Sequence, residues 1–163
     1  DVWRAWVVVA ARTGLRCGEM LALRWAAVDL KRRTLHVLAS LNDEDEETAP
    51  KSHQARDVPL SAQAVAALVA VKPEKVDGDA FVFPAIRTRH QVAGVLARLA
   101  KAAGLGRIGP HRLRNTFISH ALQQGVPIRT VQLWAGHSSI AQTEAYAVGA
   151  APAASVDVLD AAG

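Results

Sequence analysis

Apolar residues along the chain recur mostly with the period of a helix, and several apolar stretches end at a glycine. Residues 2–12 are apolar on almost every side, and Gly14 follows shortly after them. Glycine tolerates the left-handed backbone that often follows a helix, so this spacing predicts a buried helix that ends at Gly14. Similar patterns predict further helices, at residues 16–25, 62–71, 89–103, 110–124 and 127–135.

Capping residues support the ends of these predicted helices. Ser61 stands where an N-cap is expected, and Pro110 occupies a first helical position, where its missing N–H costs nothing. Ser139 and Gln142 form a capping-box pattern that predicts a last helix containing Tyr146. Three glycines close the predicted helices in the second half, namely Gly104, Gly125 and Gly136.

Three short segments have the composition of strands. Residues 28–30, 34–41 and 57–60 carry β-branched and apolar residues and predict a small antiparallel sheet whose hairpin carries Lys51. The expected fold class is therefore α+β, mainly α-helical, with a small antiparallel β-sheet at one edge. The four tryptophans are expected to anchor the core, namely Trp3, Trp6, Trp25 and Trp134.

Composition narrows the class of protein. The 163 residues are enough for one domain, and half of them are hydrophobic, as in an ordinary globular protein. No apolar run reaches membrane-spanning length, and the single Cys17 is typical of a reducing compartment, so we expect a cytoplasmic protein without a membrane partner. The net charge is +4 although five acids cluster at residues 43–47, so the rest of the chain is more basic and suits a polyanionic partner.

Two arginines stand in positions that suit phosphate binding. Arg16 follows the predicted helix end at Gly14, and Glu19 lies one turn further on the same face. On these two residues alone, a surface ion pair is the favoured interpretation. His111 and Arg114 are also one turn apart, at a helix N-terminus where backbone N–H groups favour anions.

A third cluster lies near the end of the chain. His137 stands in a tight turn between two predicted helices, and Tyr146 lies two turns into the second. A tyrosine hydroxyl is a nucleophile when a neighbouring group activates it. The chain contains a single tyrosine, so this role has no rival candidate.

Taken in order, these clusters resemble the signature of the tyrosine recombinases, the phage-integrase family. The first, Thr13 to Trp25, is similar to the family's Thr-Gly-Leu-Arg box, and residues 111–116 are similar to its His-x-Leu-Arg-His-Thr box. Residues 136–146 resemble its Gly-His-Ser-Ser box followed by tyrosine, and residues 50–60 resemble its β-hairpin lysine motif. The resemblance runs from about residue 13 to residue 146.

The resemblance implies a catalytic domain that cleaves and rejoins DNA through a 3′-phosphotyrosyl intermediate. It implies that Arg16 and Arg114 clamp the scissile phosphate and that His111 and His137 add hydrogen-bond donors. Lys51 would protonate the leaving 5′ oxygen, Tyr146 would be the nucleophile, and Glu19 would orient its neighbours without touching DNA. Neither a metal nor a cofactor is expected, and the partners would be double-stranded DNA and further copies of the protein in a tetramer.

The resemblance also predicts the domain organisation, and the sequence differs from the family pattern at one position of the second box. We expect residues 1–163 to form the catalytic domain alone, without the N-terminal core-binding domain that members of the family usually carry. Asn115 stands where the family most often has a second histidine, and it is interpreted as structural support. The Gly-x-Gly-x-x-Gly pattern at residues 104–109 follows a predicted helix, so a loop between helices is favoured over a dinucleotide site.

Two alternatives remain open. A type IB topoisomerase uses a similar set of side chains, and plasmid relaxation without strand exchange would favour it. A DNA-binding relative that has lost catalysis would fail to form a covalent adduct with DNA. The retention of every expected polar group favours an active recombinase over the second alternative.

Overall fold

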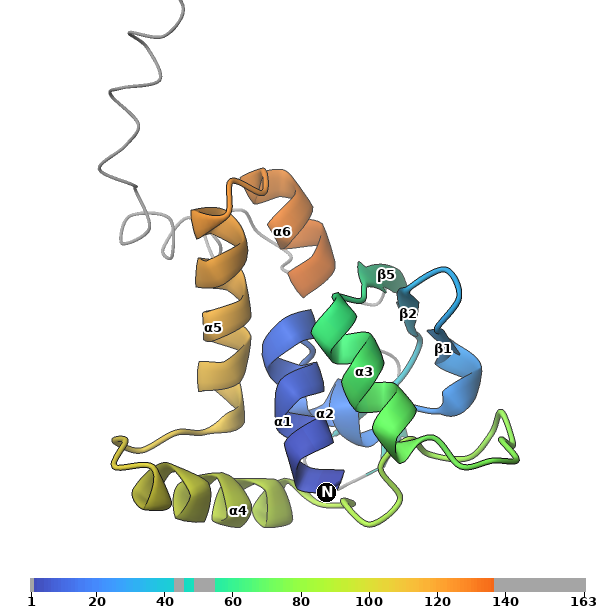
Figure 1. The fold of residues 1–163 in the computed structure, drawn as a ribbon, viewed down its shortest axis with the longest axis horizontal. Helices are drawn as coiled ribbons and strands as arrows, with labels where there is room; N and C mark the ends of the chain where they lie inside the picture. Colours follow the sequence, from blue (N-terminus) through green and yellow to red (C-terminus); the bar gives the residue numbers. More distant parts are fainter. Residues whose placement is uncertain (1, 43–45, 49–54, 137–163) are drawn as a thin grey trace, which may run out of the picture.

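The computed structural model describes residues 2–42, 46–48 and 55–136 of the chain. Its first helix, α1 (Val2–Thr13), ends as predicted, because Gly14 has a left-handed backbone with φ of +67°. Helix α1 stands in the middle of the molecule, with α3 (Ala62–Val71) on one side and α5 (Pro110–Gln123) on the other (Figure 1). Trp6 and Val9 of α1 are buried in the core.

The second helix is shorter than its apolar pattern predicts. Helix α2 (Cys17–Leu21) is only five residues long, and a 3-10 turn follows at Trp25–Ala27. The intervening backbone is extended because it pairs with residues 80–82. Val82 donates to the carbonyl of Leu23 at 2.8 Å, and Trp25 donates to the carbonyl of Ala80 at 3.0 Å. Tertiary pairing therefore overrides the helical pattern of residues 16–25.

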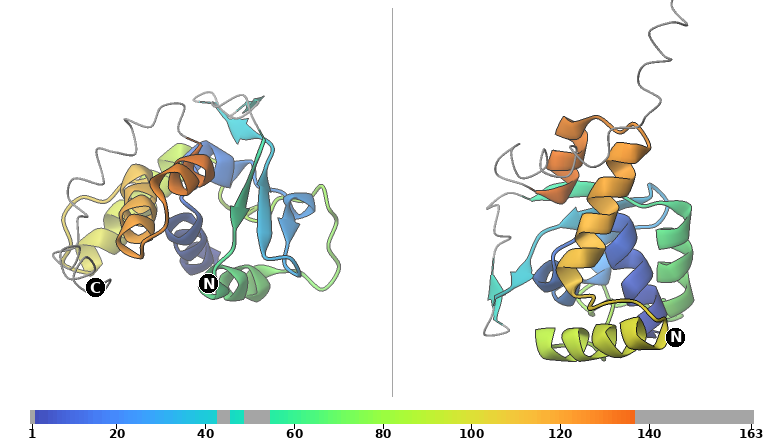
Figure 2. Two further views of the ribbon diagram at one scale, coloured as in Figure 1. Left: turned by 90° about the horizontal axis from the view of Figure 1, so that it is seen from above. Right: turned by 90° about the vertical axis from the view of Figure 1, so that its left-hand side faces the viewer.

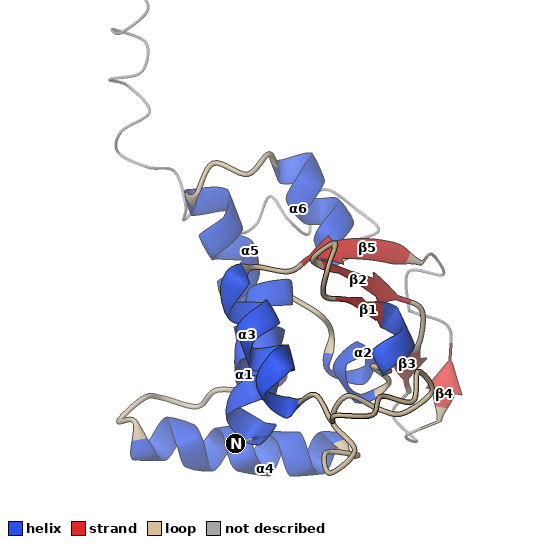
Figure 3. Cartoon of the chain, turned by 45° about the vertical axis from the view of Figure 1, so that its right-hand side comes forward, coloured by secondary structure: helices blue, strands red, loops and turns tan. Residues whose placement is uncertain are grey.

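A three-stranded antiparallel sheet forms one edge of the molecule, in the order β1–β2–β5 (Figure 3). Its strands are β1 (Val28–Asp29), β2 (Thr34–Val37) and β5 (Arg56–Pro59). Leu35 of β2 lies opposite Val58 of β5, and both side chains are buried. On the other face of the same strands, His36 pairs with Asp57 across 2.6 Å. The predicted mainly helical α+β fold with a small edge sheet is confirmed.

The long strand predicted at residues 34–41 is divided in two. Residues 40–41 leave the first sheet and form β3 (Ser40–Leu41), which pairs with β4 (Glu47–Thr48). Residues 38–39 between the two strands belong to neither sheet, and Leu38 is 59% exposed. One continuous strand would keep pairing with β5, whereas the observed change of partner takes residues 40–41 into a second, two-stranded sheet.

The remaining helices complete the second half of the fold. Helix α4 (Arg89–Ala102) runs across the base of the molecule, nearly perpendicular to α1 and α5 (Figures 1 and 2). Helix α6 (Ile128–Ala135) follows α5 after a tight turn and packs beside β5. The predicted caps at Ser61 and Pro110 and the left-handed glycines at 104, 125 and 136 are all present.

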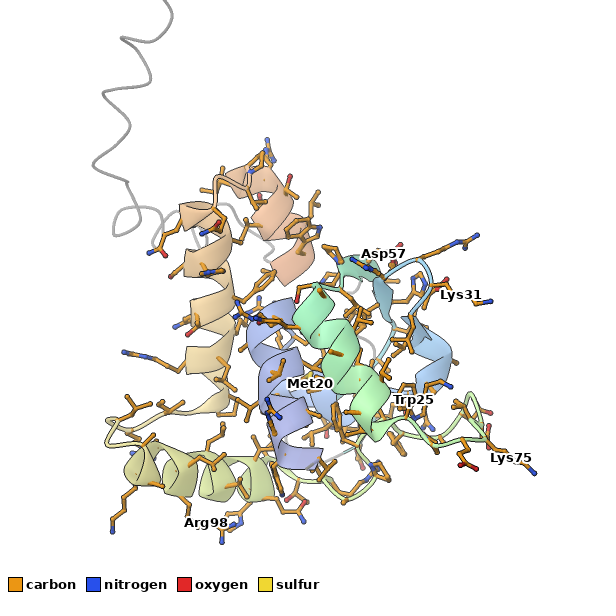
Figure 4. All side chains as sticks on the ribbon, viewed as in Figure 1. Met20, Trp25, Lys31, Asp57, Lys75 and Arg98 are labelled. Carbon is orange, nitrogen blue, oxygen red and sulfur yellow. The ribbon has the colours of Figure 1, made fainter. Side chains whose placement is uncertain are left out.

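Buried apolar residues form two separate clusters. The larger one joins α1, α2, α3, α4 and the sheet, and it contains Met20 and Trp25, which lie inward in Figure 4. Lys31, Lys75 and Arg98 project from the rim of the same view. The smaller cluster lies between α5 and α6, with Ile118 and Val131 at its centre. Four polar side chains, Arg16, Glu19, Arg56 and Arg114, connect the elements of the two clusters through hydrogen bonds and are called the polar seam below.

The four tryptophans differ in how deeply they are buried. Trp6 and Trp25 are buried core residues, whereas Trp3 and Trp134 are only partly buried and tilt against a neighbouring aromatic ring. The prediction of core anchors is confirmed for Trp6 and Trp25; Trp3 packs against the larger cluster from a partly buried position, and Trp134 belongs to neither cluster. Within the described part of the chain, no helix is long and apolar enough to span a bilayer.

Candidate active site

A pocket of about 290 Å³ opens where α2, α4 and α5 meet. Three of the predicted site residues line it, namely Arg16, His111 and Arg114. Arg89 of α4 adds a third guanidinium, and no acidic side chain is among the described residues that line the pocket. The N-terminus of α5, with Pro110 at its first position, opens onto the same space. Cations and a helix N-terminus without a nearby carboxylate suit an anion.

Arg114 is buried in the seam between the two apolar clusters. The residue is 4% exposed, and its two terminal nitrogens each donate to a backbone carbonyl at 2.6 Å. One acceptor is Gly14 after α1, and the other is Ala135 at the end of α6. A buried guanidinium is costly unless its donors are satisfied, so these bonds fix both the position and the orientation of the side chain.

Arg16 lines the same pocket from the start of α2. It precedes α2, and its backbone N–H donates to Glu19 Oε2 at 2.7 Å, which caps the helix. Its Nη1 donates to Glu19 Oε1 at 3.1 Å, and its Nη2 donates to the Gly136 carbonyl at 2.7 Å. A guanidinium carries five N–H groups, so these two bonds leave Arg16 donors for an anion in the pocket.

Glu19 is a buried carboxylate, which corrects the interpretation of a surface ion pair with Arg16. Its side chain is fully buried, and Arg56 of β5 contacts both of its oxygens, at 2.9 Å and 2.8 Å. Burial by itself raises the pKa of Glu19, but the hydrogen bonds and charge of Arg56 and then of Arg16 outweigh it. The pKa of Glu19 is therefore lowered, and the carboxylate stays ionised.

Three arginines bind three consecutive carbonyls at the end of α6. Arg56 Nε donates to Trp134 at 2.8 Å, Arg114 donates to Ala135, and Arg16 donates to Gly136. The last carbonyls of a helix lack partners within the helix and carry its negative dipole end, so cations are favoured there. This arrangement holds the chain immediately before residue 137.

His111 and Arg89 complete the described lining of the pocket. His111 lies at the start of α5, one turn before Arg114, and its side chain is exposed. Arg89, at the start of α4, donates to the carbonyls of Leu41 at 2.5 Å and Asn42 at 3.3 Å, and so joins α4 to β3. Gly18 lies beneath it, and a Cβ there would collide with the Leu41 carbonyl oxygen.

Sequence reasoning missed the roles of Arg56 and Arg89. Arg56 belongs to the hairpin motif, and a buried Glu19 requires a cation, so those two signals together could have identified the pair. Arg89 carries no comparable signal, because nothing in the sequence brings α4 next to β3.

Three predicted site residues, Lys51, His137 and Tyr146, lie outside the described residues. The structure therefore brings together Arg16, Glu19, His111 and Arg114 of the predicted set. Among residues 2–42, 46–48 and 55–136, no group of three or more His, Cys, Asp or Glu side chains lies together as a metal ion would require.

Comparison with known proteins identifies the family. The profile of the phage integrase family matches residues 2–151, nearly the whole chain, so the chain belongs to this family. A relative, tyrosine recombinase XerC of Xanthomonas axonopodis pv. citri, is 35% identical over 149 residues, which are 88% of this chain and 45% of the relative. Tyrosine recombinase XerD of Bradyrhizobium diazoefficiens is also 35% identical, over 82% of this chain and 44% of the relative.

Solved structures show the same fold. The Tn1549 transposon integrase in complex with circular intermediate DNA superposes with a TM-score of 0.72 at 26% identity, covering 86% of this chain and 53% of that one. The XerA recombinase superposes with a TM-score of 0.68 at 28% identity, covering 90% of this chain and 53% of that one. The chain spans about half the length of the curated relatives that it matches.

Proposed function

We propose that residues 1–163 form a catalytic domain that cleaves and rejoins DNA at specific sites, without a metal or a high-energy cofactor. The observation that carries this proposal is the pocket lined by Arg16, His111 and Arg114, in which no described lining residue is acidic. A phosphodiester in this space would meet two arginines that protein carbonyls hold in place. Fixed cations of this kind stabilise the charge that develops on phosphate oxygens in the transition state.

The reaction follows from these groups and from three residues outside the described part. The hydroxyl of Tyr146 loses its proton to solvent as its oxygen attacks the scissile phosphorus, and the bond from phosphorus to the 5′ oxygen breaks. Lys51 gives a proton to that leaving oxygen, and the DNA 3′ end stays attached to the tyrosine as a phosphodiester. Attack by another 5′ hydroxyl reverses the step and rejoins the strand, so no energy source is consumed.

The remaining groups act on the same phosphate. Arg16 and Arg114 hold its non-bridging oxygens, because a guanidinium can donate two parallel hydrogen bonds to them. His111 adds a donor from the start of α5, and His137 would add another directly after the α6 end that the arginines hold. Glu19 orients Arg16 and has no contact with DNA in this scheme.

Double-stranded DNA is the proposed partner, and the full-length protein would act as a tetramer on it. The chain is basic, with a net charge of +4, and the Tn1549 integrase that shares its fold was solved in complex with DNA. The positive net charge and the DNA complex of a structural neighbour thus both support DNA as the partner. The tetramer rests on the family resemblance alone.

The proposal is tested by strand exchange between two labelled duplexes. In a nicked suicide duplex, cleavage releases a short fragment that carries the 5′ hydroxyl, so the strand cannot be rejoined. This substrate should trap the chain on DNA as a denaturation-resistant adduct. Addition of a second duplex with a free 5′ hydroxyl should then release the protein and yield a joined product. Relaxation of supercoiled plasmid without joining of two duplexes would favour the topoisomerase alternative, and the absence of any adduct would favour the DNA-binding relative.

A further inference from the structure

We propose that Arg56 is a positioning residue of the active site, which fixes the end of α6 relative to Arg16 by bridging Glu19 and the Trp134 carbonyl. Its catalytic consequence rests on the DNA-cleaving function proposed above. Its structural part, the bridge between β5, α2 and α6, stands on the contacts alone.

The guanidinium of Arg56 is engaged on three sides. Nη1 and Nη2 donate to the two oxygens of Glu19 at 2.9 Å and 2.8 Å, and Nε donates to the Trp134 carbonyl at 2.8 Å. The side chain is only 9% exposed. A planar fork in which every nitrogen donates has one orientation, so Arg56 transmits the position of β5 to both α2 and α6.

Arg56 and Arg16 form one network through their shared partners. Both donate to the carboxylate of Glu19, and they bind carbonyls two residues apart, at Trp134 and Gly136. Glu19 therefore sets the distance between the two guanidinium groups, while the end of α6 spans them. A shift of Arg56 would move the phosphate-binding Arg16 together with the backbone that leads into residue 137.

The packing around Arg56 leaves little room for another arrangement. A Cβ added to Gly136 would lie 2.9 Å from Arg56 Cζ and 2.9 Å from its Nη1. The guanidinium thus packs directly on the glycine at the end of α6. This contact crosses the seam between the two apolar clusters, which share no buried apolar residue.

Lysine cannot replace this bridge. Its ammonium is a point charge that can reach the Glu19 carboxylate but cannot hold both oxygens and the Trp134 carbonyl in one plane. Arg56→Lys should therefore preserve folding better than Arg56→Met, yet leave the end of α6 loose. A displacement of about 1 Å at reacting groups can reduce rates by on the order of 100-fold. We expect binding of the DNA backbone elsewhere to stay unchanged.

The test compares Arg56→Met, Arg56→Lys and Glu19→Gln with the double variant Arg56→Met/Glu19→Gln. Arg24→Met is the matched control, since Arg24 also contacts a carboxylate and a carbonyl but lies outside the pocket. DNA affinity is measured by fluorescence anisotropy, and the single-turnover cleavage rate is measured on a nicked suicide duplex at saturating protein. Exchange of the Gly136 amide, which bonds to Leu133, reports on the last turn of α6.

Both Arg56 variants should cleave on the order of 100-fold more slowly with unchanged affinity, and their Gly136 amide should exchange faster. The double variant should be no slower than the slower single variant, because Arg56 acts through Glu19.

Wild-type cleavage in Arg56→Lys, a slower cleavage that weaker DNA affinity explains, or an equal loss in Arg24→Met would overturn the proposal. If wild type itself forms no adduct, the proposed function fails, and unchanged exchange at Gly136 would then refute the bridge independently. If Arg56→Met does not fold, Arg56→Lys decides the same questions.

Discussion

The two arginines proposed to bind phosphate are themselves held by hydrogen bonds to the protein. Arg114 donates to two carbonyls from opposite sides of the seam, and Arg16 shares its guanidinium between Glu19 and Gly136. These bonds fix the cations within the protein itself, so the proposed reaction would require little reorganisation as charge develops on the phosphate. Preorganisation of this kind depends on the shape of the guanidinium as well as on its charge.

Replacement of Arg16 by lysine tests this dependence on shape. An ammonium keeps the positive charge but cannot bind Glu19, Gly136 and two phosphate oxygens at once, so the cleavage barrier should rise by about 3 kcal/mol. Single-turnover cleavage of a nicked suicide duplex gives the rate. Arg32→Lys, at an exposed arginine outside the pocket, is the control and should cleave like wild type. A wild-type rate for Arg16→Lys would mean that Arg16 is structural.

The ionised Glu19 predicts a specific dependence of stability on pH. Because the pKa of this carboxyl is lowered in the folded state, its stabilising contribution is complete above the ordinary carboxyl range and is lost as pH falls through the lower folded pKa. Glu19→Gln leaves Arg56 with a neutral partner and should reduce the free energy of unfolding by about 3 kcal/mol at pH 7. The difference from wild type should shrink below about pH 4.

Urea unfolding at pH 7, 5, 4 and 3 measures this difference. Glu47→Gln is the matched control, because Glu47 forms a partly exposed ion pair with Arg24 and should contribute about 1 kcal/mol or less. Equal losses for both variants, or a Glu19→Gln loss that does not change with pH, would refute the role assigned to the buried pair.

At the scale of elements, the end of α6 depends on the arginines that bind its carbonyls and on Gly136, which has a left-handed backbone and no Cβ. Gly136 has φ of +65°, and a Cβ there would meet Arg56 at 2.9 Å. Gly104 has the same φ of +65° after α4, but a Cβ there would have no atom within 4 Å. The two glycines therefore share their backbone requirement and differ in their surroundings.

Alanine at each position separates these two effects. Gly104→Ala should cost about 1–2 kcal/mol, the ordinary cost of a left-handed backbone for a residue with a Cβ. Gly136→Ala should cost more and should also slow DNA cleavage, because its methyl group displaces Arg56. Urea unfolding and single-turnover cleavage measure both effects. Equal stability losses in the two variants would show that the contact with Arg56 has no energetic weight.

The elements also show what the sequence could and could not predict. Helix ends at Gly14, Gly104 and Gly125 were predicted because a left-handed cap is a local property of the chain. The early end of α2 was missed because residues 23–25 pair with residues 80–82, a contact far apart in sequence. Arg16, His111 and Arg114 were recognised by motif, but the bond from Arg56 to Glu19 spans 37 residues and became visible only in the fold.

At the scale of the whole molecule, the site lies where the two apolar clusters meet. The α5–α6 cluster is small, and arginine hydrogen bonds join its end to the larger cluster. The proposed substrate pocket is thus built from the same polar seam that connects the two parts. The proposed cleavage would therefore depend on the integrity of the seam.

The 163-residue chain should bind DNA weakly, with strong salt dependence and little sequence preference. Its net charge is only +4, it spans about half the length of its relatives, and phosphate contacts supply affinity without reading bases. Anisotropy titrations of a recombination-site duplex and a random duplex across a salt series measure this. A steep log–log slope and nearly equal affinities are expected. Tight, salt-insensitive and sequence-specific binding would show that this domain holds a complete recognition surface.

In the proposed mechanism Tyr146 carries the covalent bond to DNA, and because the chain contains a single tyrosine, this assignment can be tested directly. The wild-type chain is trapped on a nicked suicide duplex, the DNA is trimmed with nuclease, and the modified residue is located by peptide mass spectrometry. We predict a 3′-linked nucleotide on Tyr146, and no adduct with Tyr146→Phe, which should bind DNA as wild type does. An adduct on any other residue, or an adduct formed by Tyr146→Phe, would contradict the mechanism.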